Sequence, residues 1–446
     1  GTTPTRMWPA PGVFDGLTST AALLRNVAGV PLGPQADPAV LAPVALATVA
    51  GCLLGSCSGL VPGLHANNFA LLLAGAAPSV PLDPLALGAA MLAAGVVHTF
   101  LDIVPALALG VPDGAMAAAA LPGHRLVIRG RGREALRLSA LGSGAAVAVA
   151  TLLAFPTTWL MLRLAPLLTA WFPVVAAGVL ALLLATEPSH TARLAGVVAF
   201  GLATALGAAT LGLSLAGPIS GSVLAPLFGG LFGAPVLLDA LDGSGVPEQD
   251  DAALAIPPRD LGLSAAAGGL SGAAVGYLPG VSAGVAATIS LPAVPARSDL
   301  RGFVAATRGA NSSPAVLSLF ALLALGSPGS GVLVGVDDAG VPLVLPVLLS
   351  VVVVAAATGF VLVGVLGDAA FRVVSQLDQR RLAIAVLCLL VVLSALFAGP
   401  AGVAVFAIAT LVGLVAVRIG ARRVYLMGVL LGPLAFGLKT RRYAAA

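Results

Sequence analysis

The chain alternates long apolar stretches with short segments that are rich in glycine, proline and charged residues. A helix that spans a bilayer needs about 20 mostly apolar residues. The stretches that could form such helices are residues 40–60, 84–100, 136–155, 157–186, 193–213, 218–238, 261–278, 315–326, 340–366, 380–397, 400–418 and 423–438. Pro166 and Pro173 interrupt the 157–186 stretch, which predicts two short helices there. The pattern predicts an all-α polytopic membrane protein with about 10 to 12 transmembrane segments.

The composition supports a membrane protein and excludes other classes. Hydrophobic residues make up 59% of the chain and charged residues only 9%, whereas a soluble domain carries roughly 25% charged residues. The lipid bilayer is therefore its surroundings, and nothing indicates a nucleic-acid partner. Cys52, Cys57 and Cys388 show no metal-ligand spacing, so we expect buried small side chains and no metal site. Residues 1–38 are expected to form a loop or a surface segment, with no cleavable signal pattern.

A polar pattern occurs twice. The first copy is GLVPGLHANNFALLLAG followed by LALGVPDGA, and the second is GYLPGVSAGVAATIS followed by LALGSPGSG. The two Pro-Gly pairs are 217 residues apart and the two LALG runs are 216 apart. Paired segments that glycine and proline interrupt indicate the substrate site of a transporter. The sequence thus predicts two related repeats, residues 39–238 and 261–446, joined by an acidic linker at 239–260. About seven crossings separate the copies, and an odd number favours inverted repeats.

Each copy also predicts a broken helix. The apolar runs 69–77 and 285–291 are too short to cross and end at Pro78 and Pro292. Re-entrant hairpins explain this pattern, because their exposed backbone groups are tolerated at membrane depth only against protein or a water-filled cavity. A helix that begins at such a tip offers free N–H donors to a carboxylate or phosphate. Opposed helix C-terminal carbonyls can coordinate a sodium ion.

The polar residues at these tips and at the next breaks are the candidate substrate-binding residues. They are Pro62, Gly63, His65, Asn67 and Asn68 at the first tip, Pro279, Gly280, Ser282 and Thr288 at the second, and Asn311, Ser312, Ser313, Ser327 and Ser330 beyond it. The alternative is that they only cap broken helices. We expect almost no Arg or Lys inside a span, with Arg163 as a possible exception that reaches the interface. An anion would then be bound mainly by amides, hydroxyls and helix ends.

Three ionisable residues are candidates for ion coupling: His98, Asp102 and Asp113. His98 and Asp102 are four residues apart and share one helical face. Ionisable groups in a span are functional candidates by default, and a His–Asp pair could relay a proton. A structural hydrogen bond is the alternative. The sequence offers no nucleophile–base arrangement, metal cluster or phosphate loop, so neither an enzyme nor a cofactor is expected. Sodium or a proton remains possible as a coupling ion.

Charge asymmetry predicts orientation in a plasma membrane. The basic loops are expected in the cytoplasm. They contain Arg125, Arg129, Arg131, Arg133 and Arg137, then Arg297, Arg301 and Arg308, then Arg372, Arg380 and Arg381, and finally Lys439, Arg441 and Arg442. The linker at 239–260 carries Asp242, Glu248, Asp250 and Asp251 and is expected on the outside.

Two long runs resemble the large membrane subunit of tripartite tricarboxylate transporters, in the branch typical of archaea. One covers residues 100–143 and contains a proline-containing break, a Gly-rich basic loop and Glu134-Ala135-Leu136. The other covers residues 309–335, with LALGSPGSG. The resemblance implies uptake of citrate-like carboxylates, driven by an ion gradient, with an extracytoplasmic binding protein and a small membrane subunit as partners. The chain has Asn311-Ser312 where the family has Asn-Asn, and His65 where glycine is typical.

A second resemblance supports an alternative. LPGVSAG at residues 278–284 is similar to a signature of the undecaprenyl-phosphate translocase family. Such a protein would bind a lipid phosphate through the same helix ends and need no binding protein. A third alternative is a membrane scaffold that transports nothing. The sequence favours a permease for an organic anion, a di- or tricarboxylate, that works by alternating access.

Overall fold

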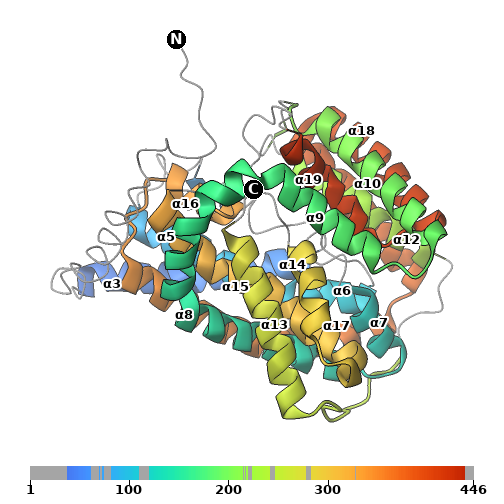
Figure 1. Ribbon diagram of the computed structural model, residues 1–446. Coiled ribbons are helices and arrows are strands. Elements are labelled where there is room, and N and C mark those ends of the chain that lie inside the picture. The colour runs from blue at the N-terminus through green and yellow to red at the C-terminus, as the bar shows by residue number, and fades with distance from the viewer. Residues whose placement is uncertain are drawn as a thin grey trace.

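The computed structural model describes residues 38–61, 70, 73–74, 82–109, 120–213, 215, 217–218, 223–241, 247–277, 283–326 and 328–436. In these residues every regular element is a helix (Figure 1). Six of the helices are long and apolar enough to cross a membrane. This confirms the prediction of an all-α polytopic membrane protein.

The order of helices follows the two halves of the sequence. The first half contains α3 (Pro38–Leu60), α5 (Pro84–Leu101), α6 (Ile103–Leu109), α7 (Ala120–Ile128), α8 (Gly132–Ala170), α9 (Phe172–Ala185), α10 (His190–Thr210), α11 (Leu224–Phe228), the π-helix η4 (Gly229–Gly233) and α12 (Ala234–Ala240). The second half contains α13 (Pro258–Gly276), α14 (Ala283–Ser290), the 3₁₀ turns η5 (Leu291–Ala293) and η6 (Ala296–Ser298), α15 (Asp299–Leu325), α16 (Gly331–Asp338), α17 (Leu345–Gln376), α18 (Gln379–Arg418), the 3₁₀ helix η7 (Arg423–Met427) and α19 (Gly428–Ala435).

The helices pack into two groups, each with its own hydrophobic core. The larger core joins α3, α5 and α8 to α13, α15 and α17. A second core joins α9, α10 and α11 to α18, η7 and α19. Figure 1 shows this second group to one side of the first. Each group thus takes helices from both halves of the sequence, whereas the predicted boundaries at 238 and 261 follow the repeat along the chain and stay a prediction.

Glycines at every fourth position bring the first two helices of each half together. They are Gly51, Gly55 and Gly59 in α3, and Gly268, Gly272 and Gly276 in α13, each pair of equivalents 217 residues apart. A Cβ on Gly51 would overlap the carbonyl oxygen of Ala90 in α5, and one on Gly268 would overlap that of Ala306 in α15. Small residues at this spacing let helix backbones approach closely. The repeat in the sequence is therefore also a repeat in packing.

The paired helices run parallel in both halves. Along α3, Gly51 lies against Ala90, Gly55 against Ala94 and Gly59 against Leu101. Along α13, Gly268 lies against Ala306, Gly272 against Ala310 and Gly276 against Pro314 and Leu317. When two consecutive helices run parallel, the chain between them must return to the end at which the first helix began.

The two halves run in opposite directions. The beginnings of α8, α13 and α15 meet at one end of the large group, which we call the ionic end, through Glu134–Arg301 and Asp260–Arg297 contacts of 2.7 and 2.5 Å. Helix α17 runs toward that end, because Asp368, near the end of α17, pairs with Arg133 at the beginning of α8.

Helix α5 runs parallel to α17, since Gly88 lies near Val341 and Phe100 near Gly359. Consequently α3 and α5 run toward the ionic end, while their equivalents α13 and α15 run away from it. The prediction of inverted repeats is confirmed for these helices.

A re-entrant hairpin is present in the second half. Helix α13 enters at the ionic end, α14 has only eight residues, and Arg297 returns the chain to the same end, where its guanidinium donates hydrogen bonds of 2.5 and 2.6 Å to Asp260. These bonds raise the pKa of Arg297 above its usual value. An α-helix of eight residues is about 12 Å long and cannot cross a bilayer. The hairpin predicted for the first half falls on residues 62–81, most of which lie outside the described part.

Several predicted helix boundaries are wrong. The break in the 157–186 stretch falls at Trp171, so Pro166 lies inside α8 and only Pro173 begins a new helix. Asn311, Ser312 and Ser313 lie within the continuous helix α15 and not at a break, because the preceding residues 299–310 are also helical.

Helix α18 confirms the division predicted between residues 397 and 400. Its backbone leaves helical geometry at Gly399, where φ is 66°, a region that favours glycine. Gly229 lies against both Leu390 and Phe406, on opposite sides of Gly399. A straight helix would hold those two residues about 24 Å apart, so α18 folds back on itself.

The cysteines differ from the expectation that all three are buried. Cys52 is buried, while Cys57 and Cys388 are exposed. They lie on α3 and α18, in strongly apolar stretches that each qualify as a membrane span. Apolar side chains on such a helix need no protein cover where they contact lipid, because lipid tails are as apolar as a protein core.

The acidic linker lies at the same end as the first basic loop, which corrects the expectation that they face opposite sides. Asp251 pairs with Arg137, and the backbone N–H of Asp250 donates to the carbonyl of Gly130 at 2.8 Å. Gln249 accepts a hydrogen bond of 2.6 Å from the N–H of Gly132. Charge counting missed this because the acidic residues neutralise the basic loop directly.

The close packing of α13 on α15 predicts the effect of a single methyl group. Gly268→Ala is expected to lower the free energy of unfolding by about 1–3 kcal/mol, the usual cost of overpacking, since the new Cβ meets the Ala306 carbonyl. Gly262→Ala is the matched control on the same helix, because a Cβ there meets nothing within 4 Å. Thermal unfolding in detergent measures both. Equal melting temperatures for the two variants would contradict the packing.

Candidate functional site

A buried polar cluster lies where α5 ends and α15 passes beside it. Asp102 is the single residue between α5 and α6. Pro105 has no N–H to donate to the carbonyl of Leu101, which accounts for the interruption at this point. Asp102 still caps α5, because its own N–H donates to the carbonyl of His98 at 2.9 Å. The carboxylate is thereby held at the end of a helix that is buried on nearly every side.

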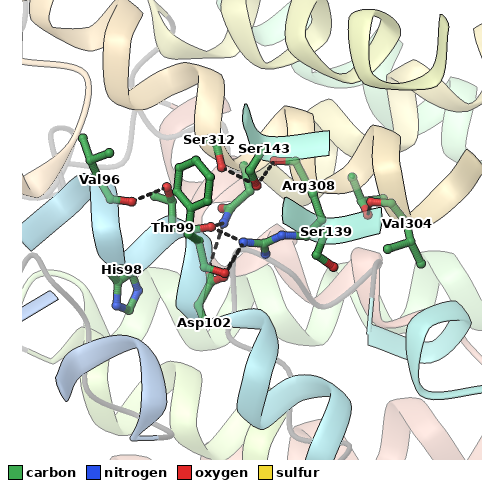
Figure 2. A network of polar contacts seen from close by, with 12 residues as sticks. Val96, His98, Thr99, Asp102, Ser139, Ser143, Val304, Arg308 and Ser312 are labelled. Atoms are coloured by element: carbon green, nitrogen blue, oxygen red, sulfur yellow. Dashed lines mark hydrogen bonds and ion pairs between the residues drawn. The ribbon is translucent and has the colours of Figure 1, made fainter. Parts of the chain in front are cut away.

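Arg308 of α15 is the partner of this carboxylate. Its Nη2 lies 2.8 Å from Oδ1 of Asp102, and the two side chains are 0% and 4% exposed. The same Nη2 donates to the carbonyl of Thr99 and, at 3.4 Å, to that of Phe100. Figure 2 shows the guanidinium directed from α15 toward Asp102. The pair joins the first half of the chain to the second.

Asn311 completes the contacts to the carboxylate. Its Nδ2 donates to Oδ2 of Asp102 at 2.7 Å and to the carbonyl of Thr99 at 3.3 Å. Asn311 and Arg308 are three residues apart and therefore share a face of α15. Arg308 thus forms an ion pair with Oδ1 of Asp102 and Asn311 donates a hydrogen bond to Oδ2, and both of these residues lie in the second half.

Hydroxyl groups connect the cluster to α8. Ser312 donates to Ser143 at 2.8 Å, and Ser143 donates to the backbone carbonyl of Arg308 at 3.5 Å (Figure 2). The neighbouring Gly142 permits this approach, because a Cβ there would lie 2.5 Å from the carbonyl oxygen of Ala305. Three helices, α5, α8 and α15, therefore contribute to one cluster.

Burying the charges of this cluster costs free energy. Removing two charges from water is repaid only when geometry is good and the remaining hydrogen-bonding groups are satisfied. Within the part of the chain that the structure describes, Nε and Nη1 of Arg308 are buried without a hydrogen-bond partner. A buried group of this kind calls for a specific explanation, and a functional role is one of the few available.

His98 is also buried, and its ring contacts a different helix. Its Nδ1 lies 3.0 Å from the hydroxyl of Ser58 in α3. His98 and Asp102 share a helical face as predicted, yet they contact different helices. The proton relay between them stays a prediction. Among the described residues, no group of three His, Cys, Asp or Glu is placed to hold a metal ion.

The remaining predicted residues divide into two groups. Outside the described part lie Pro62, Gly63, His65, Asn67, Asn68, Asp113, Pro279, Gly280, Ser282 and Ser327. Thr288 lies in α14, and Ser330 caps α16 by accepting a 3.4 Å hydrogen bond from the N–H of Leu333. The hydroxyl of Ser313 is buried without a partner among the described residues, next to Gly272. Only Asp102, Asn311 and Ser312 are thus seen in the central cluster.

Helix α3, which precedes the first predicted tip, ends beside this cluster. Gly59, near the end of α3, packs against Leu101 and the backbone of Asp102. Gly276, at the end of α13, packs against Pro314, two residues past Ser312. The helices that lead into both tips therefore end near the central polar residues.

Arg308 is the residue that sequence reasoning missed, because it was assigned to a basic loop with Arg297 and Arg301. The structure places Arg297 and Arg301 at the ionic end and Arg308 in the interior. A signal existed: from Gly302 to Ser313 the chain contains no other charged residue, and small residues surround Arg308. Arg163 stacks over Trp159 at 4.7 Å on α8, and its position at the membrane interface stays a prediction.

Inverted halves, a re-entrant hairpin and a buried charged cluster at an interrupted helix are features of secondary transporters. The comparisons with known proteins agree. The chain belongs to the tripartite tricarboxylate transporter TctA family, whose sequence model matches residues 45–428. It is also similar to an uncharacterized protein of Methanocaldococcus jannaschii, with 30% identity over 292 residues, covering 64% of this chain and 70% of the relative. No solved structure matches.

The family match confirms the resemblance drawn from residues 100–143 and 309–335 and assigns the chain to a family of transporters. The comparisons give no support to the lipid-phosphate alternative. The chain is thus a multi-pass membrane protein of a transporter family.

Proposed function

We propose that this protein is a secondary permease for an organic anion, a di- or tricarboxylate, and carries out no chemical conversion. The observation that supports this best is the buried set of Arg308, Asp102 and Asn311, which joins the two inverted halves. A buried cation in a membrane protein is costly and is a functional candidate by default. The planar guanidinium of Arg308 suits a carboxylate, because it can donate two parallel hydrogen bonds to one.

The inverted halves support alternating access as the mechanism. The α13–α14 hairpin opens to the ionic end, and α3 and α5 begin at the opposite end. Rocking one repeat against the other would expose a site between them first to one side and then to the other. We propose that the anion is bound between the tips near 62–69 and 279–288.

Ion coupling and partner subunits complete the proposal. A sodium or proton gradient drives uptake, with His98, Asp102 and Asp113 as the candidate coupling residues. An extracytoplasmic binding protein and a small membrane subunit are the proposed partners, consistent with the tripartite family. The protein would lie in the plasma membrane, with its basic loops in the cytoplasm. Because the acidic linker contacts the first basic loop, the linker would then lie in the cytoplasm too.

Uptake into vesicles tests the proposal. Purified protein is reconstituted, and accumulation of radiolabelled citrate and succinate is followed with a sodium gradient, a proton gradient or neither. Gradient-dependent accumulation is expected for one of the two substrates. The variant Asn67→Ala/Asn311→Ala is expected to abolish uptake while still inserting and folding. Uptake unchanged in that variant would remove both residues from the site. Absence of uptake with every gradient, with and without the partner subunits, would contradict carboxylate transport.

A further inference from the structure

The hydrogen bonds around Arg308 are unevenly distributed over its guanidinium. Nη2 carries two hydrogens and faces three acceptors: Oδ1 of Asp102 and the carbonyls of Thr99 and Phe100. Nε and Nη1 carry the other three hydrogens and have no partner among the described residues. A guanidinium binds a carboxylate best with two parallel N–H donors from one edge. Two edges of the guanidinium suit a carboxylate, one formed by Nε and Nη2 and the other by Nη1 and Nη2. Each edge contains one nitrogen without a partner in the described part of the chain, so Asp102 uses neither edge fully.

The cluster nevertheless holds a carboxylate already. Oδ1 of Asp102 lies on Arg308 and Oδ2 lies on Asn311, at 2.8 and 2.7 Å. Both donors project from the same face of α15, while the carboxylate comes from the other half of the chain. Arg308 and Asn311 therefore form a two-point receptor for a carboxylate, and this structure shows that receptor occupied by one of the protein's own side chains.

We infer that Arg308 and Asn311 bind a carboxylate group of the transported anion, and that Asp102 is a tethered competitor which occupies this receptor when no anion is bound. The inference rests on the proposed function and names the residues that recognise its substrate. Exchange keeps the guanidinium of Arg308 neutralised in both states. The carboxylate of Asp102, once displaced, needs a proton or water to offset its own charge. The incoming group gains the two-donor edge that Asp102 leaves unused.

Competition by Asp102 lowers the apparent affinity for the anion, which a purely structural ion pair would not do. The receptor is competent for the anion only in the fraction of molecules where Asp102 has left it, and apparent affinity falls by that fraction. Asp102→Asn removes the competing charge with little change in shape. It is expected to bind the anion at least about tenfold more tightly than the natural protein. A pair that served only to hold α5 and α15 together would predict equal or weaker binding.

The test measures equilibrium binding of citrate, succinate and inorganic phosphate to the full chain in detergent by calorimetry. Four proteins are compared: the natural sequence, Asp102→Asn, Arg308→Gln/Asp102→Asn and Arg137→Gln/Asp251→Asn. The second of these double variants removes an exposed ion pair of the same composition at the ionic end. It controls for the lost charges. The Arg308→Gln/Asp102→Asn variant leaves no unpaired charge and is expected to fold. Asp102→Asn leaves Arg308 unpaired, so thermal unfolding checks that both variants are folded under the conditions of the binding measurement.

The expected result is tighter binding of a carboxylate by Asp102→Asn, loss of binding in Arg308→Gln/Asp102→Asn, and unchanged binding in the surface control. Binding by the natural protein that persists in the folded Arg308→Gln/Asp102→Asn variant would overturn the receptor and leave the proposed function standing. Equal or weaker binding by Asp102→Asn would overturn the competitor. Phosphate binding with the same variant pattern would overturn the assignment to carboxylates. If neither the natural protein nor Asp102→Asn binds a carboxylate, and vesicle uptake is also absent, the proposed function itself fails.

Discussion

Arg308→Gln is expected to destabilise the protein by about 3–5 kcal/mol, because it leaves the carboxylate of Asp102 buried and uncompensated. Asp102 is 3% exposed, and without the guanidinium it loses its ion pair while Asn311 still donates to Oδ2. The variant is also expected to lose transport. Thermal unfolding in detergent and citrate uptake into vesicles measure the two effects.

The double variant Arg308→Gln/Asp102→Asn separates the two effects. Replacing a buried ion pair by neutral groups is often neutral or stabilising, whereas removing one partner alone is costly. We therefore expect the double variant to recover most of the stability that Arg308→Gln loses, but none of the transport. If both variants are equally unstable, the cost arises from lost packing of the arginine and not from the unpaired charge.

Glu134→Gln is expected to lower the free energy of unfolding by about 2–3 kcal/mol, the range for lost hydrogen bonds to a charged group. Glu134 is fully buried at the ionic end. Its carboxylate accepts from Arg301 at 2.7 and 3.2 Å, from Arg131 at 2.5 Å and from the N–H of Ala255 at 2.7 Å. A glutamine has only one acceptor oxygen, and its amide would point N–H groups at a guanidinium. Chemical or thermal unfolding in detergent measures the change.

Asp251→Asn is the matched control for Glu134→Gln. It neutralises a carboxylate at the same end, but Asp251 and its partner Arg137 are 67% and 46% exposed. Exposed ion pairs contribute about 0–1 kcal/mol, so a small change is expected. Equal losses of stability in the two variants would show that burial of Glu134 has no special importance.

Much of the fold could be predicted from the sequence, because a bilayer imposes simple rules. A spanning helix must be long and apolar, and interrupted segments must be buried in protein. These rules located α3, α5, α10 and the division of α18 at Gly399 within a few residues. The Pro-Gly pairs 217 residues apart indicated related halves, and other glycines at the same spacing form the close contacts of α3 and α13.

The candidate site could be predicted only in part. Asp102, Asn311 and Ser312 were identified as polar residues in an apolar setting, and the structure brings them together. Arg308, the cation of the cluster, was missed. From the sequence, an arginine close to other basic residues is read as part of a basic loop, and Arg308 follows Arg297 and Arg301 along the chain. Its position depends on the length of α15, whose polar beginning was taken for a loop.

The sequence by itself determined that this protein is helical, polytopic and duplicated, since hydrophobic length and the spacing of glycine and proline are local properties. Only the tertiary structure decided which helices share a core, which end each half faces and which charges meet. Arg308 and Asp102 lie in different halves, and the acidic linker is distant in sequence from the basic loop it contacts. Such pairings depend on the direction and contact of packed helices, and nothing in a local pattern specifies them.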